Sequence, residues 1–209
     1  MLLINNNDVH RILSVEECVS VQKEAFRGLL TGASVYRPRV DVYAPCDRQD
    51  AYFRWGSVDG ACQGYFAIRI KSDILTWPTN QSGLQTEKNH CVQPGTYCGL
   101  VLLFSTGNGE PLAIINDGNL QHLRVGASGG LGTELLSRGN SRSVGLVGSG
   151  AMARTFLPAI AAVRSLERVK VFSRSKANRE QYAREMADQL GIEVIAVDDP
   201  AAAVRGVDI

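Results

Sequence analysis

The chain has 209 residues and a formal net charge of +1, with 44% hydrophobic and 21% charged residues, the balance of an ordinary globular protein. A charge so near zero gives no basis for binding nucleic acid or an anionic membrane. No apolar run reaches the ~18 residues of a membrane span, and polar residues 5–8 replace the apolar stretch of a signal peptide, so we expect a cytoplasmic protein.

The first predicted element is a helix over residues 14–31. Its start, Ser14-Val15-Glu16-Glu17, has the pattern of a capping box, in which side chains satisfy backbone N–H groups that the helix leaves free. Apolar residues then recur at steps of three and four, the period of one helix face. Gly32 follows as a residue that can close the helix.

Three strands are predicted next, because the period of the apolar residues changes to two. They cover residues 36–44, 51–58 and 64–71. Alternate residues of a strand point to the same side, so the third strand directs Arg69 and Lys71 to one face. These two cations either line a site or face solvent.

Residues 76–95 are predicted to form a long loop, since they are polar and rich in proline, glycine and amides. A loop of that length inside a domain is typical of functional segments.

A hairpin follows, with strands at 97–104 and 111–116 around a glycine turn. The next helix, 120–135, contains four glycines that each cost about 1 kcal/mol against alanine. Close packing against another backbone would offset that cost.

Strands and helices alternate from Ser143 onward, which predicts a parallel sheet with crossover helices. The predicted strands cover residues 144–147, 169–172 and 193–197, with another beginning at 207. The predicted helices cover residues 151–163, 177–190 and 200–205. A doubly wound dinucleotide domain has about six strands, so we expect this domain to be incomplete at the C-terminus.

The strongest motif is G-x-G-x-x-A, carried by Gly148, Ser149, Gly150, Ala151, Met152 and Ala153. It follows a predicted strand and opens a predicted helix, which is the context that the motif requires. Gly148 permits a tight turn, Gly150 lets the backbone approach a pyrophosphate, and Ala153 allows close packing. The free N–H groups at the helix start favour phosphate, so we predict a nicotinamide dinucleotide site.

The end of the second strand of this sheet indicates which cofactor binds. NAD sites usually carry Asp or Glu there, whereas the 2′-phosphate of NADP attracts cations. Here the sequence is Ser173-Arg174-Ser175-Lys176, with two hydroxyls, two cations and no acid. We predict NADP(H) over NAD(H); the alternative is that Arg174 and Lys176 are solvated loop charges.

The five cysteines are scattered and form no Cys-x-x-Cys pair, and the three histidines lie far apart. We therefore predict reduced thiols and no metal site. Four cations, Arg39, Arg69, Lys71 and Arg124, come from three separate predicted elements, since Arg69 and Lys71 share the third strand. Each alone is more often a surface charge, but together they have the chemistry that grips a substrate carboxylate.

The sequence resembles the ornithine cyclodeaminase/mu-crystallin family along the whole chain. The likeness rests on the helix motif from Leu120 through Arg124 to Ala127, on the glycine loop that follows it, and on the hairpin at 105–113. Gln121, Val125 and Gly126 depart from the family pattern. In true cyclodeaminases an aspartate base lies in the part of the fold that would follow Ile209.

The resemblance implies roles by position. Arg39 and Arg124 match the arginines that bind the substrate carboxylate, and Thr86 matches a threonine that touches the cofactor. A family lysine corresponds to Lys71 or Arg69: the neighbouring Ser72 favours Arg69, whereas the distances to residues 78–80 and 83–86 favour Lys71. We choose Lys71 as the catalytic and substrate-binding residue, with Arg69 as a second catalytic cation.

The resemblance also implies the architecture, α/β with a substrate-binding and dimerisation domain of α+β type at 1–123, a connecting helix at 124–141 and a Rossmann-type domain at 142–209. The implied activity is hydride transfer at the Cα of an amino acid or cyclic imino acid by a cytoplasmic homodimer. A net imine reductase is favoured slightly over a cyclodeaminase that recycles its cofactor. The alternatives are a non-enzymatic NADPH-binding protein and an inactive fragment.

Overall fold

The computed structural model describes residues 1–80, 83–84, 87–89 and 99–209. They divide into two compact units. The first unit comprises residues 1–12 and 24–121, and the second comprises residues 13–23 and 122–209. Two helices, α2 (Val15–Thr31) and α3 (Asp117–Leu136), therefore contribute residues to both units.

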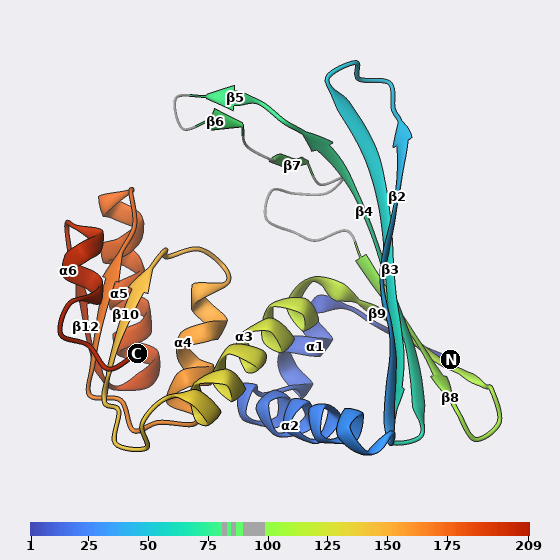
Figure 1. The fold of residues 1–209 in the computed structure, drawn as a ribbon, viewed down its shortest axis with the longest axis horizontal. Coiled ribbons are helices and arrows are strands. Elements are labelled where there is room, and N and C mark those ends of the chain that lie inside the picture. The colour runs from blue at the N-terminus through green and yellow to red at the C-terminus, as the bar shows by residue number, and fades with distance from the viewer. Residues whose placement is uncertain (81–82, 85–86, 90–98) are drawn as a thin grey trace. The chain divides into compact units, whose positions relative to one another are not determined.

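The first unit is built on one mainly antiparallel sheet, with the strand order β1-β9-β8-β4-β3-β2 (Figure 1). Its hairpins confirm the predicted strands, although three of these are longer than predicted. The elements are β1 (Leu2–Ile4), α1 (Asn6–Ile12), β2 (Ser34–Pro45), β3 (Ala51–Cys62), β4 (Tyr65–Thr76), β8 (Gly99–Ser105) and β9 (Pro111–Asn116).

The loop predicted over residues 76–95 is wrong at several described positions. β5 (Thr79–Asn80) pairs with β6 (Gly83–Leu84), and β7 (Glu87–Asn89) pairs with the end of β4. Composition misses such strands because their hydrogen bonds come from a partner that is distant in sequence. β1 and α1 were also missed, since elements of three and seven residues are too short to show a period.

The predicted capping box at the start of α2 is confirmed. Glu17 donates its backbone N–H to Ser14 Oγ over 3.1 Å, and Ser14 donates its own to Glu17 Oε2 over 2.9 Å. Hydrogen bonds to the Glu17 carboxyl from the Ser14 backbone N–H and then from the Ser14 side chain hold its pKa below the ordinary value. Gly32 follows the helix with a φ of +77°, a left-handed conformation that glycine adopts without strain.

The glycines of α3 lie against α4 (Ala153–Ala161) in the second unit. A Cβ added to Gly126 would lie 2.6 Å from the carbonyl oxygen of Thr155, and one on Gly130 would lie 2.6 Å from that of Ala159. No side chain fits at such distances, so the expected packing against another backbone is confirmed at these two positions. A Cβ on Gly132 would meet nothing within 4 Å, so packing gives no reason for glycine there.

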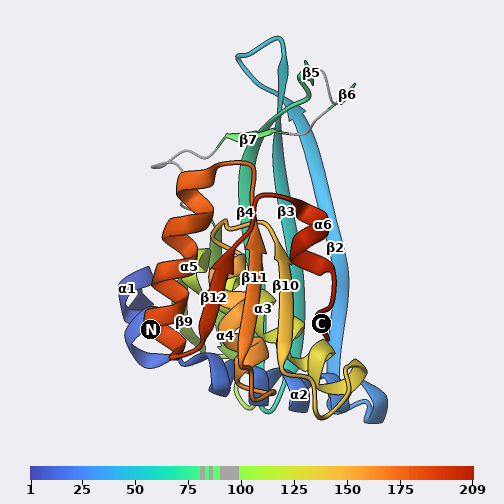
Figure 2. The ribbon, with the colours of Figure 1, turned by 90° about the vertical axis from the view of Figure 1, so that its left-hand side faces the viewer.

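The second unit carries the predicted parallel sheet, in the order β10-β11-β12 (Figure 2). α4 and α5 pack on the face to which Val144 and Val171 point, over a buried core that includes Leu157 and Tyr182. α6 lies on the opposite face, where Gly145 leaves room for its backbone. The elements are β10 (Ser143–Val147), β11 (Arg168–Phe172), α5 (Lys176–Leu190), β12 (Glu193–Ala196) and α6 (Pro200–Val204).

Residues 207–209 lie beside β10, where a further strand was expected to begin. Gly145 donates its N–H to the carbonyl of Ile209 over 2.8 Å, and Ile209 donates its own to Ser143 over 3.1 Å. The structure assigns no strand there. Hydrogen bonds from Arg142 and Ser143 lower the pKa of the Asp208 carboxyl to about 2, so an ionised carboxylate ties this segment to the start of β10.

The two glycine environments in α3 make a testable pair. Gly130→Ala places a methyl group against the Ala159 carbonyl, and we expect the overpacking to cost about 1–3 kcal/mol of unfolding free energy. Gly132→Ala meets nothing, so we expect a gain of up to about 1 kcal/mol from helix propensity. Thermal or denaturant unfolding measures both. Equal effects of the two substitutions would contradict the packing described here.

Candidate functional site

The G-x-G-x-x-A residues form the turn between β10 and α4. Gly148 has a φ of +123°, which L side chains rarely adopt, and donates its N–H to the Phe172 carbonyl over 2.7 Å. Ala151 and Met152 continue the turn, so α4 begins at Ala153, two residues later than predicted. A Cβ at Gly148 or Gly150 would meet nothing within 4 Å. The loop therefore leaves the open space that a dinucleotide pyrophosphate requires.

A chain of hydroxyl bonds connects this loop to the end of β11. Ser149 Oγ donates to Ser173 Oγ over 2.8 Å, and Ser173 Oγ donates to the Ser175 carbonyl over 3.2 Å. Ser175 Oγ accepts the N–H of Asn178 and so caps α5. The hydroxyl proton of Ser173 is therefore already used in a hydrogen bond within the protein. The sequence alone did not predict this bond.

Arg174 is exposed on the loop after β11, and Lys176 is exposed as the first residue of α5. Lys176 Nζ lies 3.8 Å from Glu180 Oε1, with both side chains largely in water. Such a pair contributes little to stability. Both cations can thus turn toward a ligand phosphate at small energetic cost.

The first unit gathers the predicted cations Arg39, Arg69 and Lys71 on one sheet face. Lys71 lies opposite Gly56 of β3, and Gly56 lies opposite Asp41 of β2. A Cβ on Gly56 would lie 2.3 Å from Asp41 Oδ1 and 3.0 Å from Arg39 Nη2. Glycine at position 56 therefore lets the Arg39–Asp41 ion pair lie across the sheet toward β4.

Asp73 links Lys71 to a second buried cation, Arg54. Its Oδ2 atom lies 3.0 Å from Lys71 Nζ and accepts from both Nε and Nη2 of Arg54. All three side chains are almost wholly buried. Burial alone would raise the pKa of the Asp73 carboxyl, but the hydrogen bonds from Arg54 and Lys71 lower it below its ordinary value.

Arg69 is held by two residues of α3. Its Nε donates to Asp117 Oδ2 over 2.8 Å, and its Nη2 donates to Gln121 Oε1 over 2.6 Å. Asp117 itself packs close to Gly99, where a Cβ would lie 2.9 Å from its Oδ2. Gln121, a departure from the family pattern, thus has a defined task in fixing Arg69.

Two other predicted site residues, Arg124 and Thr86, are not among the cations gathered on this sheet face. Arg124 is exposed on α3 and belongs to the second unit, where its carbonyl accepts hydrogen bonds from Gln22 and Ser128. Thr86 lies outside the described residues. Sequence reasoning missed Arg54, Asp73 and Asp117. Asp73 is two residues beyond Lys71 on the same strand, so the period of two could have placed it with the cations.

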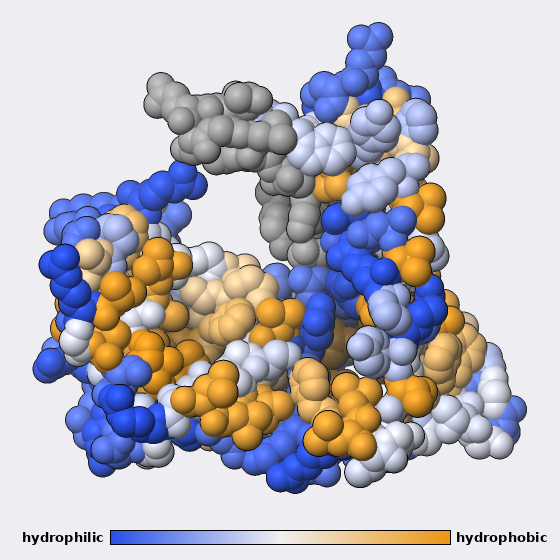
Figure 3. Space-filling view, viewed as in Figure 1, coloured by the Kyte–Doolittle hydropathy of each residue, from blue (hydrophilic) through white to orange (hydrophobic). Residues whose placement is uncertain are grey.

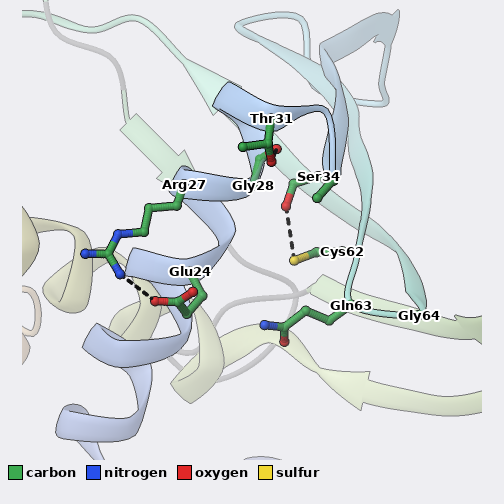
Figure 4. A pocket seen from close by; sticks show the side chains of 9 residues that line it. Glu24, Arg27, Gly28, Thr31, Ser34, Cys62, Gln63 and Gly64 are labelled. Carbon is green, nitrogen blue, oxygen red and sulfur yellow. Dashed lines mark hydrogen bonds and ion pairs between the residues drawn. The ribbon is translucent and has the colours of Figure 1, made fainter.

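A cavity of about 450 Å³ lies elsewhere in the first unit, between the end of α2 and the β3–β4 turn (Figure 4). Glu24 and Arg27, which both line it, form an ion pair, and Ser34 donates a hydrogen bond to Cys62 Sγ over 3.2 Å. It contains none of the predicted site residues.

Among the described residues, no group of His, Cys, Asp and Glu can hold a metal ion. No helix in the described ranges is long and apolar enough to cross a membrane.

Comparison with known proteins matches the ornithine cyclodeaminase/mu-crystallin family model over residues 80–209. A Δ1-pyrroline-2-carboxylate reductase of Bacillus cereus is 32% identical over the whole chain, and the chain spans 60% of that protein's length. The solved reductase of the same name from Thermococcus litoralis, in complex with NADH and L-proline, is 23% identical with a TM-score of 0.78, over 100% of this chain and 60% of that one.

An archaeal alanine dehydrogenase dimer with bound NAD is also similar in structure. It is 24% identical, with a TM-score of 0.76 over 95% of this chain and 56% of that chain. These likenesses confirm the predicted α/β fold with its Rossmann-type sheet. The curated relative and both solved structures extend well beyond the length that this chain covers.

The Asp73 cluster predicts a pH dependence of stability. A folded pKa below the unfolded value of about 3.9 gives stability that is present above that pH and lost as the pH falls through the folded pKa. Asp73→Asn leaves two buried cations without this carboxylate, and we expect a loss of about 3–5 kcal/mol at neutral pH.

Unfolding curves between pH 2 and pH 7, roughly the range in which carboxylates titrate, measure this. We expect the variant to be less stable at neutral pH and to lose less stability on acidification than the wild type. Asp50→Asn removes an exposed carboxylate that pairs with Arg48 and serves as the matched control. An Asp73→Asn variant that keeps the full acid sensitivity would contradict the assignment.

Proposed function

The chain belongs to the ornithine cyclodeaminase/mu-crystallin family, and from this membership we propose a nicotinamide-dependent reductase of cyclic imino acids. The observation that carries the proposal is the gathering of Arg39, Arg69 and Lys71 on one sheet face, in a chain that also has an open dinucleotide loop. The substrate class fits a carboxylate beside a C=N bond, as in the Δ1-pyrroline-2-carboxylate after which the Bacillus cereus relative is named.

When bound, a reduced nicotinamide cofactor would supply a hydride to the imine carbon, and the imine nitrogen would take one proton from solvent, so that the C=N bond becomes CH–NH. Arg39 and Lys71 of the first unit bind the substrate carboxylate and orient that carbon, and the family pattern adds Arg124 as a further residue that binds the carboxylate. Lys71 is buried, where its positive charge acts more strongly on a carboxylate or imine than it would in water. Arg69, fixed by Asp117 and Gln121, adds a second positive charge beside it.

Gly148, Ser149, Gly150, Ala151 and Met152 would hold the pyrophosphate of the cofactor, since their turn is open and precedes the first N–H groups of α4. The family pattern adds Thr86 as a further contact. Ser173, Arg174, Ser175 and Lys176 would lie at the adenosine ribose. The solved relatives are described with NADH and with NAD, while the cations of this loop support NADP(H) here.

We also propose a homodimer formed through the sheet face opposite the cations. Val42 and Trp55 are direct neighbours on β2 and β3, and both are exposed, as is Leu100 of β8. Hydrophobic residues are exposed among hydrophilic ones along these strands (Figure 3). Apolar residues exposed together on one sheet face are typical of a surface that binds a partner, and the archaeal alanine dehydrogenase is a dimer.

The activity test follows NAD(P)H consumption with Δ1-pyrroline-2-carboxylate, and NAD(P)+ with L-ornithine in a separate assay. We expect turnover with the imine. Arg124→Ala should lower kcat/KM by about 1.5–3 kcal/mol of lost charged hydrogen bonding, roughly ten- to hundredfold, and leave nucleotide affinity unchanged. Arg27→Ala, another exposed helix arginine, is the control. Nucleotide binding without turnover of either substrate would overturn the enzyme and favour a binding protein.

The cofactor preference has its own test. Arg174→Ala removes one of the two cations from the loop after β11, so NADPH should bind about tenfold more weakly, the loss of one charged hydrogen bond. NADH affinity should not change. Fluorescence titration with both nucleotides measures this. Wild-type protein that binds NADH as tightly as NADPH would contradict the assignment of the 2′-phosphate site.

A further inference from the structure

Arg154, the first residue after the glycine motif, donates a hydrogen bond into the loop that precedes it. Its Nη1 lies 2.7 Å from the Ser149 carbonyl, and its Nη2 lies 2.5 Å from Glu185 Oε2 on α5. The guanidinium also stacks 5.4 Å from the centre of the Tyr182 ring. Tyr182 is fully buried and donates its hydroxyl to the Ala153 carbonyl. Three contacts on two elements therefore fix the guanidinium.

We propose that Arg154 is a positioning residue, which sets the direction of the Gly150 N–H for the cofactor pyrophosphate. This inference rests on the cofactor binding proposed above. In a planar trans peptide the C=O of one residue and the N–H of the next point in opposite directions. The Ser149 carbonyl is turned toward Arg154, so the Gly150 N–H is directed away from the guanidinium, and Gly150 itself is exposed.

Glycine at position 150 makes such a device necessary. A glycine adopts either orientation of the preceding peptide readily, because it has no Cβ to restrict its backbone angles. The open space around Gly150, with nothing within 4 Å of a Cβ position, offers no packing that would choose between them. The hydrogen bond from Arg154 to the Ser149 carbonyl favours one of the two orientations, and it lowers the entropic cost of ordering the loop when the ligand binds.

Glu185 keeps Arg154 in place. Hydrogen bonds from Gln181 and then Arg154 lower the pKa of the Glu185 carboxyl, so it stays ionised at neutral pH. The charge of Arg154 is thereby largely neutralised within the protein. Its effect on the pyrophosphate is therefore mainly geometric, which separates this role from that of an arginine that contacts phosphate directly.

The second cofactor loop has the same arrangement. Arg179, a buried residue of α5, donates to the Ser173 carbonyl over 3.0 Å, is paired with Asp198 and lies over the Phe172 ring. By the same peptide geometry, the Arg174 N–H is directed away from Arg179. Arg154 and Arg179 thus each hold the backbone of one cofactor loop through a carbonyl group. Arg154 gives the clearer test, because the peptide that it holds leads into a glycine, Gly150, whereas the peptide that Arg179 holds leads into Arg174.

The test compares Arg154→Met with Arg164→Met, using NADPH and NADH as probes. Arg164 makes six hydrogen bonds, to the end of α3, to the two residues that follow it and to Val163, and none of them reaches the glycine loop. Its loss therefore destabilises the same unit without moving Ser149. We expect Arg154→Met to weaken both ligands roughly tenfold or more, the loss of a charge-assisted hydrogen bond. Arg164→Met should lower the melting temperature and keep both dissociation constants.

Arg154→Lys completes the experiment. Lysine retains the charge but cannot span both Ser149 and Glu185 with the planar fork of an arginine, so we expect only partial recovery of affinity. Full recovery would show that charge alone acts and would overturn the geometric role. Wild-type affinity in Arg154→Met, or equal losses in Arg164→Met, would overturn it too. Wild-type protein that binds neither probe would refute the cofactor proposal, and this inference with it.

Discussion

Burial of cations on the β3–β4 face is the constraint on which the first unit depends. The side chains of Lys71, Arg54 and Arg69 are 4%, 10% and 15% exposed, and removing such groups from water costs several kcal/mol for each ion. Asp73 and Asp117 offset that cost, but only if β3, β4 and the start of α3 keep their register. Gly56 and Gly99 belong to the same arrangement, because a side chain at either position would strike one of the paired groups.

The charge balance of this face bears on the proposed chemistry. Four cations, Arg39, Arg54, Arg69 and Lys71, are paired with three carboxylates, those of Asp41, Asp73 and Asp117. Among these residues one positive charge is in excess, which a single substrate carboxylate would neutralise. The carboxylates also hold the cations in fixed positions before any ligand arrives, so little reorganisation is needed on binding. Without these carboxylates, the cations on this face would repel one another and would be harder to bury.

Features encoded by neighbouring residues were predictable, and those created by the tertiary fold were not. The capping box at Ser14, the glycine turn at Gly148 and the hairpin between β8 and β9 each lie within a few residues, and the structure confirms them. Arg54 and Asp117 carry no such signal, since one charge in a strand or at a helix start resembles any other. Only the pairing of β3 with β4, and of Arg69 with α3, gives them a role.

The hydroxyl chain from Ser149 to Ser173 restricts how this fold can distinguish two nicotinamide cofactors. Ser173 already donates its proton to the Ser175 carbonyl and accepts one from Ser149, so its hydroxyl can offer a phosphate no further hydrogen. Ser175 Oγ accepts from Asn178 but keeps its own proton available. A preference for NADP(H) must then come from Arg174, Ser175 and Lys176. Because the two cations are exposed to solvent, that preference would weaken with rising ionic strength. The hydrogen bond from the buried Arg179 to the Ser173 carbonyl would be screened much less.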